Sequence, residues 1–438
     1  MAELDELLTA ALRDLATEAP ALPPLPPRAR RRIRARRATA IVASVAVVAG
    51  VSAGAVLGVR ALTKAAPPPA SPRHQVTAYV LSGSGRVIPI RAATNQALPP
   101  IKLGRNRVLC TIAVTPDGKT AYVASHGPGF AGTVTPIRTA TGTALRPVKV
   151  GPGPCALAVT PNGKTVYVIN LASNTVTPIR TATNTALPPI RVGSRPLAIA
   201  ITPDGKTAYV TTRGPVARCP GTVTPIRIAT TTALPPVRVG GCPIAIAITP
   251  DGKTAYVAAG SQVTPIRTAT NTALRPIKDG HIPVAIAITP DGKTAYVVNF
   301  ATSRGLTVTP IRTATNKALP PITVGRTYPQ NLPSIAITPD GSTVYVITNV
   351  AGPAHPDAVT PIRTATNTAL APITVGRGSC ALAITPDGKT VYVANMSPGT
   401  VIPIQTATNT ALAPIKVGRG ACGIAVMQHG GRAETKSR

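Results

Sequence analysis

The chain contains few acidic and few aromatic residues. Its 438 residues include 14 Asp and Glu, two Phe, nine Tyr and no Trp. Five of the acidic residues lie in the first 18 positions, and six more are the Asp of a repeated turn motif. Pairs of carboxylates that could act as general acid and base are therefore scarce, which favours a non-enzymatic role. So few rings also exclude the stacking platforms of a nucleic-acid-binding protein.

Proline, glycine and positive charge are abundant instead. The 49 Pro and 37 Gly disfavour helix interiors, whereas an apolar fraction of 44% is too high for a disordered chain. The composition therefore predicts a large all-β fold with many turns. The 46 Lys and Arg give a net charge of +32, which suits an anionic partner but says nothing about the fold.

The first 75 residues form a distinct N-terminal region. Residues 1–37 combine a short acidic helix with seven Arg between Arg28 and Arg37. Residues 38–59 carry no charge and are long enough to cross a bilayer as a helix, and residues 60–75 are a Pro-rich linker. Arginine before an apolar run marks the cytoplasmic side. We therefore expect a single-pass protein of the cell membrane with its N-terminus inside and residues after about 60 extracytoplasmic.

Two alternatives to an uncleaved anchor stay open. Ala53-Gly54-Ala55 resembles the small-residue cleavage site of a signal peptide. The Arg cluster is also a pattern found in nucleic-acid-binding arms. The length of the apolar run, and its position directly after the Arg residues, favour the anchor.

Residues 76–427 repeat one unit eight times. Each unit contains a Tyr-Val pair, and successive pairs are 40 to 49 residues apart. The eight tyrosines are Tyr79, Tyr122, Tyr167, Tyr209, Tyr256, Tyr296, Tyr345 and Tyr392. A typical unit reads AIAITPDGKTAYV, a variable stretch and VTPIRTATNTALPPIKVG. Four short apolar segments, AIAI, AYV, VTPI and the PIKVG tail, thus alternate with turn residues. Four strands in each unit of this length predict a β-propeller of four-stranded blades.

The two ends of the repeat predict how the ring closes. The first unit lacks its innermost segment, and a spare one, Gly423–Val426, follows the last unit. This C-terminal strand is expected to complete the first blade, which gives eight blades; seven blades with a degenerate extra unit is the alternative. Pro in the third segment of every unit, as in Pro136 and Pro178, predicts a bulge or a position without a ladder hydrogen bond. Residues 428–438 form a basic tail.

The unit resembles the YVTN repeat of surface-layer-type β-propellers. The shared features are PDGK before the Tyr-Val pair, a Thr-Val strand and a closing Val-Gly. The third segment departs from that repeat, because Thr-Pro-Ile-Arg replaces an apolar strand that runs into Asp. The resemblance implies an extracytoplasmic propeller, mostly of unknown ligand. Some propellers with related repeats are lactonases or oxidoreductase-associated subunits.

The units differ in length mainly between their second and third segments and, at two places, between one unit and the next. In a four-stranded meander both kinds of connection lie on the same face, here called the variable face, and in repeat folds this is typically the binding face. The opposite, constant face carries one Lys and one Arg in most units, which we interpret as solvated charges copied with the repeat. All six cysteines map to the variable face, and we expect Cys219 to pair with Cys242. Cys110–Cys155 and Cys380–Cys422 would join adjacent blades only if their Cα atoms come within about 7 Å, and free buried thiols are the alternative.

The remaining polar candidates on the variable face are Asp279, His281, His355 and Asp357. They are the side chains that a polar site would use, but their spacing matches no metal site and no catalytic motif, and we expect no cofactor. The sequence thus predicts a membrane-anchored extracytoplasmic propeller that binds a cell-surface protein or an anionic envelope polymer. A lactonase-like enzyme, or a sensor that relays binding to a cytoplasmic partner, is the alternative.

Overall fold

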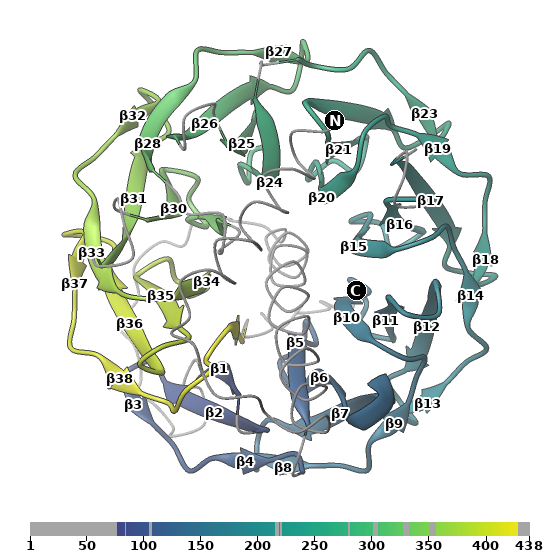
Figure 1. Ribbon diagram of the computed structural model, residues 1–438, viewed down its shortest axis with the longest axis vertical. Helices are drawn as coiled ribbons and strands as arrows, with labels where there is room; N and C mark the ends of the chain where they lie inside the picture. The colour runs from purple at the N-terminus through teal and green to yellow at the C-terminus, as the bar shows by residue number, and fades with distance from the viewer. Residues whose placement is uncertain are drawn as a thin grey trace, which may run out of the picture.

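The computed structural model describes residues 77–83, 85–104, 107–214, 219, 221–278, 281–300, 305–326, 333–349 and 356–427. These residues form an all-β propeller of eight blades arranged around a central axis (Figure 1). Eight blades, rather than seven, are therefore confirmed. The predicted cytoplasmic segment, the apolar run 38–59, the linker and the basic tail lie outside the described residues. Within the described ranges, no helix is long and apolar enough to cross a membrane.

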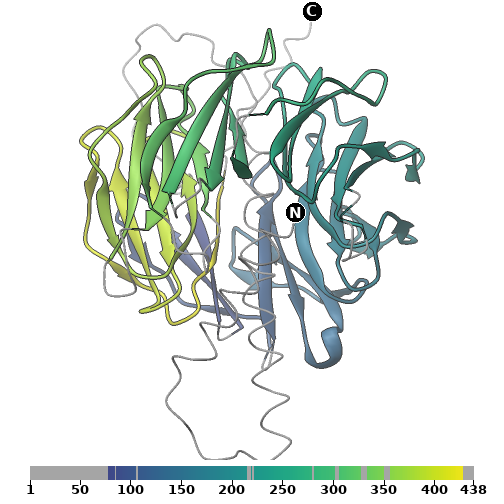
Figure 2. The ribbon, with the colours of Figure 1, turned by 45° about the horizontal axis from the view of Figure 1, so that its top comes forward.

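Each blade is an antiparallel meander whose strands run from one face of the ring to the other (Figure 2). The innermost strands are β5 (Val108–Val114), β10 (Pro154–Val159), β15 (Pro196–Ile201), β20 (Pro243–Ile248), β24 (Ile282–Ile288), β29 (Ile335–Ile337), β34 (Ser379–Ile384) and β39 (Gly423–Val426). The second strands, which carry the Tyr-Val pairs, are β1 (Thr77–Ser82), β6 (Thr120–His126), β11 (Thr165–Asn170), β16 (Thr207–Thr212), β21 (Thr254–Ala259), β25 (Thr294–Phe300), β30 (Thr343–Asn349) and β35 (Thr390–Asn395).

The third strands are β2 (Arg86–Arg91), β7 (Gly132–Arg138), β12 (Thr175–Arg180), β17 (Thr222–Arg227), β22 (Gln262–Arg267), β26 (Gly305–Arg312), β31 (Asp357–Arg363) and β36 (Thr400–Gln405). The outermost strand begins with a two-residue piece in every blade: β3 (Gln96–Ala97), β8 (Thr143–Ala144), β13 (Thr185–Ala186), β18 (Thr232–Ala233), β23 (Thr272–Ala273), β27 (Lys317–Ala318), β32 (Thr368–Ala369) and β37 (Thr410–Ala411). It ends with β4 (Ile101–Lys102), β9 (Val148–Lys149), β14 (Ile190–Arg191), β19 (Val237–Arg238), β28 (Ile322–Arg326), β33 (Ile373–Gly376) and β38 (Ile415–Lys416), and with an isolated Val263–Ile277 bridge in the fifth blade.

The outer strand is therefore broken, whereas we expected one continuous segment in the PIKVG tail. In the third blade Ala186 pairs with Ile179 and Ile190 pairs with Val176, and two prolines lie between these pairs. Proline cannot donate to a ladder, so the outer strand leaves the sheet where they occur and then returns to it.

The proline of the third strand fits into this gap. Pro178 lies opposite Tyr167 in a regular ladder, so the expected bulge at this strand is wrong. The carbonyl of Pro178 accepts a hydrogen bond from Leu187 N at 2.8 Å, and the missing N–H faces the break in the outer strand. The alternative expectation, a position without a ladder hydrogen bond, is confirmed.

The last strand closes the ring. β39 pairs antiparallel with β1, from Ala78 opposite Val426 to Leu81 opposite Gly423. The C-terminal strand thus supplies the innermost strand of the blade that the N-terminal strands begin, as predicted. No blade is left with an unpaired edge at this seam.

The repeat tyrosines fasten each blade to the next. All eight are at most 2% exposed. Six donate a hydrogen bond to the Asn of the next blade's TATNTA turn, for example Tyr122 Oη to Asn184 Oδ1 at 2.7 Å. The series continues through Tyr392 and Asn95, which lie across the seam at 2.7 Å. The hydrogen-bonded Asn residues have φ near +53°, a conformation that Asn tolerates better than most residues.

Candidate binding face

The loops between second and third strands lie against the connections between blades. Gly83 N donates to Arg419 O at 3.0 Å, and Met396 N donates to Gly378 O at 2.8 Å. Each of these bonds joins a loop within one blade to the connection that leads from one blade to the next. At these two places the connections that vary in length in the sequence are hydrogen-bonded to each other on the variable face.

The loop of the second blade presents an exposed aromatic ring on this face. The loop contains the short 3-10 helix η1 (Pro128–Phe130), and Phe130 is 46% exposed. Its φ of 61° is a strained value for a bulky residue. A hydrogen bond from Gly153 N to Phe130 O at 3.0 Å stabilises this conformation. It also ties the loop to the connection between the second and third blades. The ring of Phe130 lies 5.4 Å from that of His126, centroid to centroid.

His126 is buried beneath Phe130 at the end of β6. Burial lowers the pKa of the imidazole, although the carbonyl of Gly127 at 3.5 Å from Nδ1 acts in the opposite direction. The ring is therefore held mostly neutral near pH 7, as an apolar support for the exposed phenyl group.

A guanidinium group anchors the base of the same loop. Arg107 Nη1 donates to the hydroxyls of Thr133 and, at 3.4 Å, of Ser125. The two hydroxyls are themselves 3.1 Å apart. Arg107 comes from the connection between the first and second blades, so the network holds three segments of the variable face together. The guanidinium group is held at Thr133, three residues after Phe130.

Asp357 is the only buried carboxylate among the described residues. Ser379 N donates to its Oδ2 at 2.6 Å, and the Ser379 hydroxyl donates to Asn395 Oδ1 at 2.7 Å. Burial raises the pKa of Asp357, while this amide and the charge of Arg377 partly offset the increase. The carboxylate thus joins the third strand of the seventh blade to the innermost strand of the eighth, which is a structural role.

The other predicted polar residues do not join Asp357 in one site. His281 lies in the connection between the fifth and sixth blades, whereas Asp357 contacts the connection between the seventh and eighth. Asp279 and His355 lie outside the described residues. In the part of the chain that the structure describes, no group of three or more His, Cys, Asp or Glu could hold a metal ion.

Two disulfides lie on the variable face. Cys219, in a loop of the fourth blade, is bonded to Cys242 in the next blade connection, with Cα atoms 5.1 Å apart. Cys380 is bonded to Cys422, with Cα atoms 5.5 Å apart, and so joins the eighth blade to the strand that closes the ring. Cys110 and Cys155 are buried free thiols.

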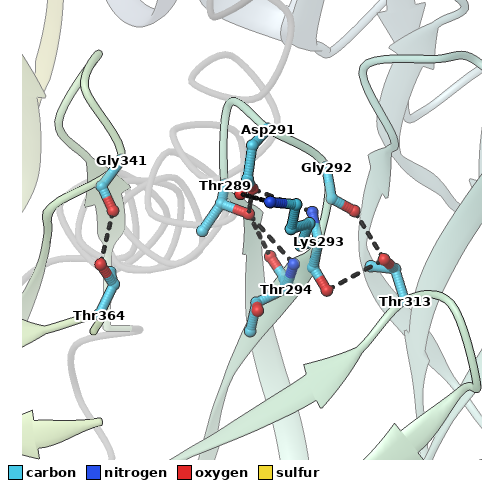
Figure 3. A network of polar contacts seen from close by, with 8 residues as sticks. All are labelled: Thr289, Asp291, Gly292, Lys293, Thr294, Thr313, Gly341 and Thr364. Carbon is cyan, nitrogen blue, oxygen red and sulfur yellow. Dashed lines mark hydrogen bonds and ion pairs between the residues drawn. The ribbon is translucent and has the colours of Figure 1, made fainter. Parts of the chain in front are cut away.

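The constant face carries a turn that recurs from blade to blade with few changes, and Figure 3 shows one copy. In one of them the Thr289 hydroxyl donates to Asp291 Oδ1 at 2.6 Å, and Lys293 N donates to the same oxygen at 3.0 Å. Partial burial opposes ionisation, but these hydrogen bonds and the Lys293 charge lower the pKa of Asp291. Thr313 Oγ1 then donates to Gly292 O at 2.6 Å and fastens the turn to the third strand. The turn Asp is thus a structural residue.

The lysine of each turn is a surface charge. Lys293 Nζ lies 3.6 Å from Asp291, and its side chain is 82% exposed. Exposed pairs of this kind contribute on the order of 0–1 kcal/mol to stability. This arrangement fits solvated charges that are copied with the blade.

A shallow hollow of about 300 Å³ lies between the seventh and eighth blades. Its lining includes Val375, Asn395, Ile402 and Leu412 and contains no charged side chain. Leu412 is 37% exposed at its rim. The hollow therefore offers no acid or base for catalysis.

No protein-family model and no curated protein sequence matches this chain. Its fold is shared by solved structures. One is the hydrazine synthase of Kuenenia stuttgartiensis, with 24% identity, a TM-score of 0.54, and coverage of 68% of this chain and 95% of that one. Another is the dihydro-heme d1 dehydrogenase NirN, with 15% identity, a TM-score of 0.66, and coverage of 82% and 77%.

A third is a Bacteroides fragilis protein described as a 6-phosphogluconolactonase, with 18% identity, a TM-score of 0.55, and coverage of 82% and 100%. At these identities the similarity shows the propeller fold alone, because one fold hosts many activities. The YVTN resemblance stays an interpretation of the repeat.

Phe130 and Ser379 were not among the residues predicted from the sequence. Phe130 is one of only two Phe residues in the chain and lies in a loop of variable length, which was an available signal. Ser379 is the first residue of its innermost strand, at a repeat position where four of the eight units have Pro, as in Pro154 and Pro196, and no other unit has Ser.

Proposed function

We propose that the propeller is the extracytoplasmic binding module of a single-pass membrane protein, and that its variable face binds a cell-surface protein or an anionic envelope polymer. The membrane anchor and its orientation rest on the uncharged run 38–59 and the Arg cluster before it. Binding by the variable face rests on the local structure described above.

The observation that carries the proposal is the conformation of Phe130. Among the described residues it is one of two exposed large hydrophobic side chains, and it is held at a strained φ by contacts from two blades. Strained, exposed positions that the surroundings enforce are typical of functional surfaces. Aromatic side chains, Phe included, are also enriched in the cores of protein interfaces.

The positive charge of the propeller agrees with an anionic partner. Residues 65–438 contain 36 Lys and Arg against nine Asp and Glu. Such an excess attracts anionic surfaces over a distance of about 10 Å at 0.1 M salt. A polymer bound mainly by charge would dissociate as salt is added, whereas a protein bound around Phe130 would be less sensitive.

Binding of the full-length chain in detergent to isolated cell envelopes tests the proposal. Three samples are compared: the unchanged chain, Phe130→Ala, and Leu412→Ala as a control that removes the other exposed hydrophobic side chain. Truncation of an anchor residue costs about 2 kcal/mol or more, so Phe130→Ala should weaken binding roughly 30-fold and Leu412→Ala should not. Equal binding by all three samples, or loss with Leu412→Ala alone, contradicts the proposal.

A lactonase-like activity has less support. The likeness to a 6-phosphogluconolactonase shows the fold only. His281 and Asp357 lie at different blade junctions, and Asp357 is engaged by a backbone amide. Hydrolysis of sugar lactones by the full-length chain, lost in Asp357→Asn, would favour the enzyme instead. A sensor role would depend on residues 1–37, and deletion of residues 2–18 tests it through the behaviour of a cytoplasmic partner.

A further inference from the structure

Cys110 and Cys155 occupy the same place in two neighbouring blades. In β5 the ladder with β6 shifts between Leu109 and Thr111, and Cys110 is the extra residue of this irregularity. Cys155 is the extra residue between Pro154 and Ala156 in β10. Both side chains are 2% exposed. A bulge redirects its extra side chain out of the regular alternation of the strand.

The same position in the eighth blade carries a disulfide. Cys380 is the extra residue between Ser379 and Ala381, and it is bonded to Cys422, which directly precedes the innermost strand of the first blade. The step from Cys380 to Cys422 is one blade around the ring. The step from Cys110 to Cys155 is also one blade, in the same direction.

The contacts of the Cys380 and Cys155 sulfur atoms also show that the bulge positions of different blades are equivalent. Cys380 Sγ lies 3.3 Å from the carbonyl oxygen of Ala421, 41 residues ahead. Cys155 Sγ lies 3.9 Å from the carbonyl oxygen of Pro196, also 41 residues ahead. A bulge cysteine thus points toward the residue just before the next blade's bulge position. Cys110 Sγ lies 3.6 Å from the carbonyl oxygen of Val108 in its own strand, and the proximity of Cys110 adds to the increase in the pKa of Cys155. By equivalence with Cys380, Cys155 is the residue in the next blade that a rotated Cys110 side chain would reach.

We propose that Cys110 and Cys155, which are free thiols in the structure, form a third disulfide when the protein folds under oxidising conditions. This bond would join the second and third blades beneath the loop that presents Phe130. Two thiols lose two protons and two electrons as the S–S bond forms. The electrons pass to the disulfide of a thiol–disulfide oxidant, which becomes a dithiol. The Cα atoms of the equivalent pair Cys380 and Cys422 are 5.5 Å apart, which is within the range that disulfides span. We expect a similar separation for Cys110 and Cys155 when they are bonded.

The bond has to form before the two blades close on each other. Burial raises the pKa of the Cys110 thiol to about 12, and it raises the pKa of Cys155 as well. The thiolate is the reactive species in disulfide exchange, so both thiols are almost inert in the folded ring at neutral pH. The bond therefore forms during folding in an oxidising compartment and is protected afterwards.

Mass spectrometry of the full-length chain tests the proposal. The protein is taken from the membranes of cells that express it, denatured in guanidinium with iodoacetamide and no reductant, and digested with trypsin. The six cysteines fall in six different tryptic peptides, and Cys110 and Cys155 lie in residues 108–119 and 150–164. The expected result is a linked 108–119/150–164 pair with little alkylation of either cysteine. In Cys110→Ser, residue Cys155 should become fully alkylated.

Alkylated Cys110 and Cys155 in the unchanged protein overturn the proposal, whether or not Cys380 and Cys422 are linked. A link from Cys110 or Cys155 to any other cysteine overturns it as well. A second measurement examines timing. Protein folded under reducing conditions and then exposed to oxidised glutathione should stay unlinked at this pair for at least 100 times longer than protein that is refolded in the same mixture.

Discussion

The most direct energetic prediction concerns Tyr167, which lacks the partner that six equivalent tyrosines have. Its hydroxyl is buried, and no hydrogen-bond partner for it is found among the described residues. Where the next blade should supply Asn, it carries Thr231, whose φ of 53° equals that of Asn184. The substitution Thr231→Asn should therefore supply an amide oxygen that accepts a hydrogen bond from the Tyr167 hydroxyl. Asn184 accepts the same bond from Tyr122.

The magnitude follows from three contributions. A buried hydroxyl without a partner costs about 1–3 kcal/mol, and a new hydrogen bond contributes a net ~1 kcal/mol. Asn also tolerates a positive φ better than the β-branched Thr does. Together they give an increase of about 2 kcal/mol in the free energy of unfolding. For a cooperative unit of roughly 350 residues this raises Tm by about 3 °C.

Urea unfolding followed by circular dichroism, with a double-mutant cycle, measures this. Thr231→Asn is compared in the unchanged chain and in Tyr167→Phe, where no hydroxyl remains to be satisfied. The gain should be about 2 kcal/mol in the first and only a few tenths of a kcal/mol in the second. Asn184→Ala is the matched control, and it should destabilise by a similar amount because it leaves Tyr122 without its partner. An equal gain in both backgrounds would refute the reasoning, because the benefit would then not depend on the tyrosine hydroxyl.

Four further predictions follow from other parts of the ring. Cys422→Ser removes the disulfide at the seam, which encloses a 42-residue separation, and should lower the unfolding free energy by about 4 kcal/mol under oxidising conditions and not in the presence of reductant. Gly142→Asn should stabilise the ring through Tyr79, whose hydroxyl now has only a 3.5 Å contact with the Thr139 carbonyl; an unchanged urea midpoint would contradict this. The raised pKa of Asp357 means that the folded state binds its proton more tightly, so stability falls as pH rises above 3.8, and Asp357→Asn should raise Tm at pH 7 but not at pH 3. The lowered pKa of His126 means that stability is lost as pH falls below 6.5, and Tm measured between pH 7 and pH 5 should decline less in His126→Gln.

Local chemistry made much of the fold predictable. The Asp-Gly turn, the apolar segments and the spare strand Gly423–Val426 are each short signals, repeated often enough to specify strands, blade number and closure. The inter-blade bond between Tyr122 and Asn184 spans 62 residues and could not be predicted, since identical repeats do not show which copy contacts which. The first piece of the outer strand, such as Thr185–Ala186, was missed because TATNTAL was assigned to the turn before the fourth segment.

The candidate binding face was only partly predictable. Loop length indicated the face, because insertions accumulate where the repeat does not constrain the chain. The exposure and positive φ of Phe130 depend on contacts from Gly153 and His126, which belong to neighbouring segments of the ring. A residue that occurs once has no other copy with which it can be compared, so its conformation is visible only in the structure.

Hydrogen–deuterium exchange tests most directly the central claim that the variable face binds. The full-length chain in detergent is labelled alone and with two probes, solubilised envelope proteins and purified anionic envelope polymer. The account predicts slower exchange in the loop of residues 127–131 and in adjoining blade connections such as 151–153, with one of the probes. It predicts unchanged exchange in the Thr-Pro-Asp-Gly-Lys turns of the opposite face. Slower exchange at those turns alone, or no change with either probe, would contradict it.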